Sequence, residues 1–437
     1  MRRLGLALSF VSVLALAFAS LAPAHAQEKW VTAWAASVQG PYPVGNPSAQ
    51  PDLRFAFPSP ASGACDQTFR LIVTPDIWGR EMRLRLSNAL GTRPVTVDGV
   101  RAGLQLASAG VVAGSSRPVS FAGKSSVTVA PGDSIWSDAV ALPFVTDGAA
   151  LAGRRLAVTF HVAGESGPMT WHAKALTTSY VTAPGAGAVE GEDEAALPFS
   201  TASWYFLDAV DMMAPADTQL IVAFGDSITD GTASTLNGED RWPNVLSRRL
   251  HALGRKVSVV NAGIGGNQVV GPAEYSPQKP FAGGPSAGER LERDVLSLSG
   301  ISAVIWLEGI NDFSKNGNAE VEAVEAGMNE IVGRLRGRAP GVRVIVATLT
   351  SALGSSNAAH GSPEQDEKRK ALNEFIRTSG LFDGVADFDK ATLDPQTGGI
   401  KAEFVPESTT GGPGDKLHPN RAGYLAMGMA IDLDLLK

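Results

Sequence analysis

Two short blocks of the sequence carry the residue types of nucleophilic acyl transfer. The first is Gly225-Asp226-Ser227, which directly follows an apolar run. A serine hydroxyl is a poor nucleophile until a base removes its proton. The second block supplies that base, since His418 lies three positions after Asp415 and just before a helix-like segment. At this spacing Asp415 can hold one imidazole nitrogen while the other faces Ser227, which makes His418 a general base and then a general acid.

Two further blocks offer hydrogen-bond donors for the oxyanion that forms when a serine attacks an acyl carbon. Residues 261–267 contain three glycines after an apolar run, and Gly309-Ile310-Asn311-Asp312 follows another. A glycine lets its backbone N–H approach a substrate closely, and Asn311 can point its carboxamide N–H at the same oxygen. With the backbone N–H of Ser227, three donors are expected.

Acidic residues flank these groups, and we expect Asp226, Asp230 and Asp312 to support them. A metal or phosphoryl-transfer site at Asp226 and Asp230 is disfavoured because no second ligand cluster follows, so we expect Asp230 to orient the nucleophile turn. No metal or organic cofactor is expected, since the sequence lacks a Walker loop, a zinc-protease helix and a dinucleotide fingerprint. The other histidines lack a matching acid in the sequence and are interpreted as surface or packing residues: His161, His172, His251 and His360.

From residue 216 to residue 437, apolar strands alternate with amphipathic helices. Buried parallel strands are predicted over 220–224, 257–260, 302–307 and 342–348. One-faced helices are predicted over 242–253 and 321–335, from apolar residues at three-to-four spacing. This alternation predicts a three-layer α/β/α domain, with the chemical groups at the carboxyl ends of its strands.

Residues 27–215 show the alternation of β-strands instead, clearest over 82–86 and 156–162. Short β-rich runs punctuated by Gly91, Pro131-Gly132 and Gly164 predict an antiparallel, jelly-roll-like sandwich. The stretch 184–198, rich in glycine and acidic residues, is interpreted as a solvated loop, and 271–288 as a candidate rim of the site. We expect the sandwich to form one wall of the active-site cleft rather than an independent sugar-binding module. Exposure would decide whether its tryptophans stack on sugars: Trp30, Trp34, Trp78, Trp136 and Trp171.

The four blocks occur in the order and spacing of the SGNH, or GDSL, hydrolases, which residues 218–437 resemble. This resemblance implies a flavodoxin-like hydrolase fold, with Ser227 as nucleophile, Asp415 and His418 completing the triad, and Gly266 and Asn311 completing the oxyanion hole. The preceding β domain and Arg241-Trp242-Pro243 are similar to a secreted esterase branch related to xylan-degrading accessory enzymes. That branch is associated with removal of acetyl or other short acyl groups from carbohydrate.

Residues 1–26 are interpreted as a secretory signal peptide, because Arg2 and Arg3 precede an apolar run and Ala24-His25-Ala26 offers a cleavage site. We therefore expect a secreted or periplasmic protein with no membrane insertion after signal removal. The net charge of -7 and the lack of a basic tract argue against nucleic-acid binding. Cys65 is the only cysteine, so no intramolecular disulfide can form.

The sequence thus predicts a secreted serine esterase that acts on short-chain, in particular acetyl, esters of small molecules or polysaccharides. Two alternatives remain open. The same triad serves an acyltransferase that passes the acyl group to a sugar or alcohol. A carbohydrate-binding protein with a vestigial hydrolase site is the other alternative, against which the completeness of the four blocks counts. Sequence alone leaves the oligomeric state open.

Overall fold

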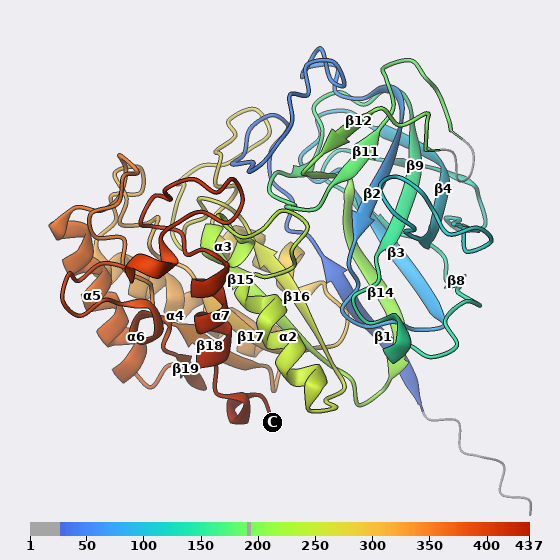
Figure 1. Ribbon diagram of the computed structural model, residues 1–437. Coiled ribbons are helices and arrows are strands. Elements are labelled where there is room, and N and C mark those ends of the chain that lie inside the picture. Colours follow the sequence, from blue (N-terminus) through green and yellow to red (C-terminus); the bar gives the residue numbers. More distant parts are fainter. Residues whose placement is uncertain (1–26, 190–193) are drawn as a thin grey trace, which may run out of the picture.

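The computed structural model describes residues 27–189 and 194–437, which form two regions built on different kinds of sheet (Figure 1). We call residues 27–215 the β region and residues 216–437 the α/β region. The expected signal peptide lies outside the described residues, as do the acidic positions Glu190, Glu192 and Asp193. Among the residues that the structure describes, no helix is long and apolar enough to cross a membrane.

The α/β region contains one sheet of five parallel strands in the order β16-β15-β17-β18-β19. The strands are β15 (Gln219–Gly225), β16 (Val257–Gly263), β17 (Ile301–Leu307), β18 (Arg343–Ala347) and β19 (Gly384–Ala386). Counted along the chain this is the order 2-1-3-4-5, so the connections leave β15 in opposite directions. Ligands bind at such a switch point in open α/β sheets, and the predicted nucleophile follows β15.

Helices cover both faces of this sheet. They are α1 (Ser227–Asp230), α2 (Trp242–Ala252), α3 (Ala287–Leu291), α4 (Val321–Arg338), α5 (Pro363–Thr378), α6 (Phe388–Thr392) and α7 (Arg421–Ala430), with short helical turns at Glu292–Leu296, Ala402–Phe404 and Leu433–Leu436. A further short helical turn, Ala149–Leu151, belongs to the β region. In Figure 1, α2 and α7 lie in front of the sheet and α4 lies behind it. Every strand and helix predicted in this region is present, and the three-layer α/β/α fold is confirmed.

The β region consists of antiparallel strands, most of them in two sheets of order β1-β14-β3-β7 and β12-β11-β2-β9-β4-β5. The strands are β1 (Glu28–Ala35), β2 (Cys65–Val73), β3 (Glu81–Ser87), β4 (Val95–Leu104), β5 (Arg117–Pro118), β6 (Ser126–Val129), β7 (Ser134–Trp136), β8 (Val140–Ala141), β9 (Leu156–Glu165), β10 (Trp171–His172), β11 (Ser179–Val181), β12 (Phe199–Thr201), β13 (Trp204–Tyr205) and β14 (Leu207–Pro215). Side chains of both sheets share one apolar core, as Phe69 and Phe160 of one sheet and Leu84 and Val210 of the other illustrate. The predicted sandwich is therefore confirmed.

One predicted turn residue of the β region lies inside a strand. Gly164 belongs to β9 and has a φ of +69°. The register there passes from Gln67↔Val162 to Cys65↔Glu165, so β9 carries one more residue than β2. Gly164 thus forms a β-bulge that bends the strand instead of ending it.

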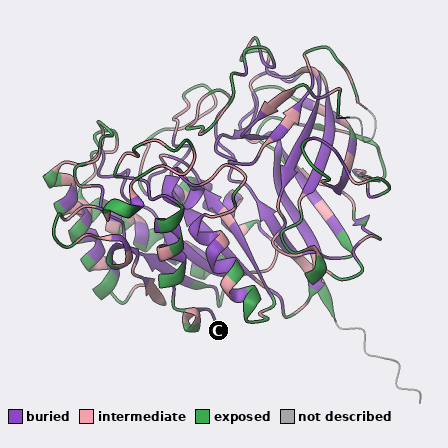
Figure 2. Ribbon diagram, in the orientation of Figure 1, coloured by how far each residue is buried: buried purple, intermediate pink, exposed green. Residues whose placement is uncertain are grey.

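The two regions meet along β1 and β16. Val31 of β1 and Ala209 of β14 belong to the same apolar core as the parallel sheet, and the Ser258 hydroxyl donates to the Thr32 carbonyl oxygen at 2.7 Å. Figure 2 shows the strands of both regions buried, with exposed residues concentrated on outer helix faces and loops. Because the core is continuous across this junction, the β region has a fixed position beside the carboxyl ends of the parallel strands.

Candidate active site

The nucleophile turn connects β15 to α1. Asp226 caps the helix, since its Oδ1 accepts the N–H of Ile228 at 2.9 Å. A Cβ atom at Gly225 would lie 2.2 Å from the Leu307 carbonyl oxygen, so the turn requires glycine there. This tight turn places Ser227 at the first position of α1, only 6% exposed. Its backbone N–H is one of those that a helix leaves without an internal partner.

A continuous chain of hydrogen bonds joins Ser227, His418 and Asp415. The Ser227 hydroxyl lies 2.8 Å from His418 Nε2, and His418 Nδ1 lies 2.6 Å from Asp415 Oδ2. Asp415 Oδ1 also accepts the backbone N–H groups of Leu417 and His418, each at 2.9 Å. If Nδ1–H donates to the carboxylate, the lone pair of Nε2 faces the serine hydroxyl, which is the tautomer that a general base needs.

The surroundings keep Asp415 ionised. Burial opposes its charge, but the hydrogen bond and electrostatic attraction of His418 and the two backbone N–H groups hold the pKa of Asp415 well below its usual value. Nearby, burial and the proximity of His418 lower the pKa of His360 to about 4. His360 is therefore neutral at physiological pH and adds no positive charge beside the triad.

The predicted oxyanion donors lie on adjoining loops. Gly266 follows β16 and has a φ of +88°, which favours glycine. Asn311 follows β17, and its Nδ2 donates to the carbonyl oxygen of Asn267 at 2.9 Å. That bond uses one of the two amide hydrogens and leaves the second for another acceptor. The structure thus places Asn311 against the loop that contains Gly266.

The carboxylate of Asp230 makes different contacts from those expected. Its Oδ2 accepts the N–H of Gly265 at 2.9 Å, and its Oδ1 lies 3.1 Å from His172 Nε2. Asp230 therefore connects α1 to the glycine loop and to the β region, instead of only orienting the nucleophile turn.

The expectation that the remaining histidines lack acidic partners is wrong for three of the four. His172 contacts Asp230, His251 contacts Asp76 at 3.1 Å, and the two ring nitrogens of His161 lie 2.9 Å from carboxylates of Asp66 and Asp98. These acids are distant from the histidines in the sequence and are brought close only by folding. No local spacing could have indicated the pairs.

Buried acidic side chains gather at and around the nucleophile turn. Burial raises the pKa of Glu308 to about 7 and that of Asp312 to about 6, and it raises the pKa of Asp226 well above its usual value. Among the described residues, Asp226 Oδ2 and Glu308 Oε1 have no hydrogen-bond partner. Asp312 accepts the backbone N–H groups of Val269 and Val270, at 2.9 and 3.0 Å, so it supports the loop after β16.

Arg290, which the sequence did not single out, joins several parts of the site. Its guanidinium donates to the carbonyl oxygens of Gly225 and Ala262, each at 2.8 Å, and to Asn267 Oδ1. It therefore fixes the end of β15, the end of β16 and the glycine loop relative to one another. No feature of the local sequence distinguishes Arg290 from the neighbouring Arg293.

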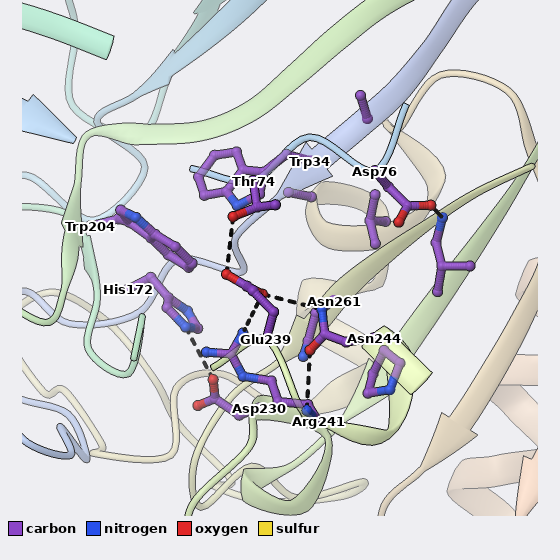
Figure 3. A pocket seen from close by; sticks show the side chains of 15 residues that line it. Trp34, Thr74, Asp76, His172, Trp204, Asp230, Glu239, Arg241, Asn244 and Asn261 are labelled. Atoms are coloured by element: carbon purple, nitrogen blue, oxygen red, sulfur yellow. Dashed lines mark hydrogen bonds and ion pairs between the residues drawn. The ribbon is translucent and has the colours of Figure 1, made fainter. Parts of the chain in front are cut away.

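A cavity of about 70 Å³ lies between the two regions, and both His172 and Asp230 line it (Figure 3). Within it, Glu239 accepts hydrogen bonds from the Thr74 hydroxyl at 3.0 Å and from Asn244 Nδ2 at 3.2 Å. The cavity is lined from both regions, so their facing surfaces interlock through polar side chains.

The tryptophans of the β region do not form an exposed sugar-binding surface. Trp34, Trp78 and Trp171 are buried. Trp30 and Trp136 are partly buried, and the guanidinium of Arg83 lies over both rings, 4.9 and 4.4 Å from their centres. The candidate rim is also tied to the β region, since the Tyr275 hydroxyl donates to Gly40 and Gln39 donates to Ala282. Its last two residues, 287 and 288, belong to α3.

Among the described residues, no group of three or more histidine, cysteine, aspartate or glutamate side chains is arranged to hold a metal ion.

One part of the chain, which contains this site, is similar to a family of known proteins. Residues 223–426, which contain all four blocks, match the model of the GDSL-like lipase/acylhydrolase family.

Similar solved structures include a carbohydrate acetylesterase from Sinorhizobium meliloti, with 16% identity over 50% of this chain and 100% of that chain and a TM-score of 0.38. A lipase/acylhydrolase from Enterococcus faecalis has 21% identity over 49% of this chain and 92% of that chain, with a TM-score of 0.36. An aryl esterase from M. smegmatis has 17% identity over 49% of this chain and 96% of that chain, with a TM-score of 0.35. A search of curated proteins found no match. The region from residue 223 to residue 426 belongs to the GDSL-like lipase/acylhydrolase family.

Proposed function

We propose that the protein is an exported serine esterase that hydrolyses short-chain carboxylic esters, acetyl esters of carbohydrate in particular. One observation carries this proposal: the unbroken hydrogen-bond chain from the Ser227 hydroxyl through His418 to Asp415. That chain supplies an activated nucleophile, its base and the acid that fixes the base. It also counts against a binding protein with a vestigial site, because the groups that turnover requires are all in hydrogen-bond contact.

In the proposed reaction, Ser227 Oγ attacks the carbonyl carbon of the ester while its proton passes to His418 Nε2. The carbonyl oxygen becomes an oxyanion, which accepts hydrogen bonds from the N–H groups of Ser227 and Gly266 and from Asn311 Nδ2. Collapse of this intermediate breaks the bond to the alcohol oxygen, which takes the proton from Nε2 and leaves the acyl group on Ser227. Water then attacks with His418 as base, and the same steps release the carboxylic acid and restore the serine.

The finer parts of the proposal rest on the sequence. Export rests on the signal-peptide pattern of residues 1–26, and the short acyl group rests on the resemblance of Arg241-Trp242-Pro243 and of the preceding β domain to the xylan-esterase-related branch. The division into domains at residues 27–215 and 216–437 is likewise a proposal. It follows the change from antiparallel to parallel sheets at β14 and β15.

The test is the initial rate of hydrolysis of p-nitrophenyl esters from acetate to a long acyl chain, for the wild type and Ser227→Ala. We expect acetate to be turned over fastest and the variant to lose about 10⁴–10⁶-fold in kcat, because the remaining groups cannot form an acyl-enzyme. Ser302→Ala is a matched control. The Ser302 hydroxyl donates to the Leu220 carbonyl oxygen near the amino ends of β17 and β15, at the opposite end of these strands from Ser227.

Three outcomes would contradict the proposal in different ways. Activity retained by Ser227→Ala removes Ser227 as nucleophile. A preference for long acyl chains removes the proposed substrate class and leaves the triad. A folded wild type that releases p-nitrophenol only when a sugar or alcohol acceptor is added would be an acyltransferase.

A further inference from the structure

A single peptide unit links the oxyanion hole to the β region. The carbonyl oxygen of Gly265 accepts a hydrogen bond from Nδ2 of Asn46, a residue of the loop after β1, at 2.6 Å. This carbonyl belongs to the same peptide unit as the N–H of Gly266. In Figure 1 the blue loop after β1 lies beside the pale-yellow loop after β16, above the junction of the two regions.

The planarity of the peptide bond gives this contact a consequence. In a trans peptide the C=O and N–H bonds lie in one plane and point in opposite directions. A donor that fixes the Gly265 carbonyl therefore also fixes the direction of the Gly266 N–H, which is the proposed oxyanion donor. A hydrogen bond to the carbonyl also polarises the peptide unit and strengthens its N–H as a donor.

A second contact holds the preceding N–H of the same loop. The N–H of Gly265 donates to Asp230 Oδ2, and the other oxygen of that carboxylate lies 3.1 Å from Nε2 of His172. His172 is 4% exposed and stacks on Trp204, with 5.4 Å between ring centres. The position of Asp230, and with it that of Gly265, is thus set from β10.

The contacts of His172 also define what the ring does. Its Nδ1 lies 2.7 Å from the Ser37 carbonyl oxygen, and its Nε2 lies near the Lys174 carbonyl oxygen and the Asp230 carboxylate. All of these partners are acceptors, so the ring faces Asp230 as a hydrogen-bond donor through Nε2.

The packing leaves no space between these β-region side chains and the glycine loop. A Cβ atom at Gly265 would lie 2.9 Å from Lys174 Nζ, and one at Gly266 would lie 2.8 Å from Asn46 Nδ2. Lys174 Nζ donates to the Thr232 hydroxyl at 2.5 Å, beside the same loop. The two glycines therefore allow the β region to contact the backbone of the oxyanion loop directly.

We propose that Asn46 and His172 are positioning residues for the reaction, which hold the Gly265–Gly266 peptide so that the Gly266 N–H points at the oxyanion. This inference rests on the proposed function. It makes the β region a working part of the active site, and a sugar-binding role is not needed to explain its presence.

The test is Asn46→Ala, measured for kcat and KM on p-nitrophenyl acetate and for inhibition by a phenylboronic acid, which forms a tetrahedral adduct with an active serine. We expect kcat to fall about 10–100-fold with KM within about twofold of wild type, because an oxyanion donor acts in the transition state. The affinity for the boronic acid should fall in parallel. Asn46→Asp, which keeps the shape and replaces the donor with an acceptor, should lose at least as much.

His172 supplies a second, independent variant pair. His172→Ala removes the donor to Asp230, whereas His172→Gln can return an N–H to that position. We expect kcat to fall for the first and to recover in part for the second. A merely structural role would not restore kcat through the donor alone, so equal losses in both variants would overturn the role of His172.

Thr74→Val is the matched control. It removes a hydrogen bond across the same junction, from the Thr74 hydroxyl to Glu239, at nearly constant volume and without touching the glycine loop. Its kcat should stay at the wild-type value, and thermal unfolding of all variants shows whether each is folded. An equal loss of kcat in Thr74→Val and Asn46→Ala would overturn the inference, because the effect would then be general loosening of the junction.

The inference and the proposed function fail in distinguishable ways. Wild-type kcat and boronic-acid affinity in Asn46→Ala, together with a strong loss in Ser227→Ala, would overturn the inference alone. An unchanged rate in Ser227→Ala would overturn the proposed function itself.

Discussion

The two sides of Ser227 are built in different ways. On the base side, His418 and Asp415 lie three residues apart on one loop, and the contacts from Asp415 to His418 and from His418 to Ser227 are made within the α/β region. On the oxyanion side, the Gly265–Gly266 peptide is held by Asn46, which is 219 positions distant in the sequence, and through Asp230 by His172. In the proposed catalytic machinery, the base side is therefore local, whereas the oxyanion side depends on a second region.

The chemistry of each side explains the difference. A histidine base has a side chain of its own, so one nearby carboxylate is enough to fix its tautomer. A glycine loop offers close backbone approach but has no side chain with which to hold itself, and glycine is the most flexible residue. Its direction must therefore be imposed by neighbours, which here come from the β region.

The largest effect that separates the two sides is expected from Asp415→Asn. The carboxamide can donate to His418 Nδ1 and so favour the tautomer with the proton on Nε2, which cannot accept the serine proton. We expect kcat to fall roughly 10³–10⁴-fold with the fold retained. The measurement is kcat on p-nitrophenyl acetate, with the melting temperature as a check of folding.

Asp98→Asn is the control for this variant, because it alters another histidine–carboxylate pair, that of His161, on the far sheet of the β region. It should leave kcat unchanged. A loss of less than tenfold in Asp415→Asn would show that the base side does not depend on its local acid and would remove the contrast between the two sides.

On the oxyanion side, Asn311→Ala should lower kcat by about 10²–10³-fold, the range known for loss of one oxyanion donor. The effect should exceed that of Asn46→Ala, because Asn311 is itself the proposed donor, whereas Asn46 only positions the Gly266 N–H. Asn329→Ala, which removes an exposed carboxamide from α4, should leave kcat unchanged. If Asn311→Ala has the wild-type kcat, Asn311 is not an oxyanion donor.

The contrast between local and long-range contacts also explains which site residues could be predicted from the sequence. Ser227, Asn311 and His418 each follow a strand or precede a helix in a short, ordered block, and such local patterns also predicted the strands and helices of the α/β region. The contacts of Asn46, His172 and Arg290 have no local signature, because each joins segments that only the complete fold brings together. His172 was interpreted as a packing residue for this reason, since its acid, Asp230, lies 58 positions away.

The buried carboxyl groups near the nucleophile turn serve both sides of Ser227. The protonation of one of them, Glu308, gives the test with the smallest expected effect. Burial raises the pKa of Glu308 from 4.5 to about 7. The folded state therefore binds a proton more tightly than the unfolded chain, and this contribution to stability is full below about pH 4.5 and is lost as the pH rises through about 7.

The variant Glu308→Gln cannot titrate at this position. Between pH 5 and pH 8 the free energy of unfolding of the wild type should therefore fall by on the order of 2–3 kcal/mol relative to that of the variant. Melting temperatures of both proteins at several pH values measure the difference, from which the similar contribution of Asp312 cancels. Parallel curves would mean that Glu308 does not change protonation between pH 5 and pH 8.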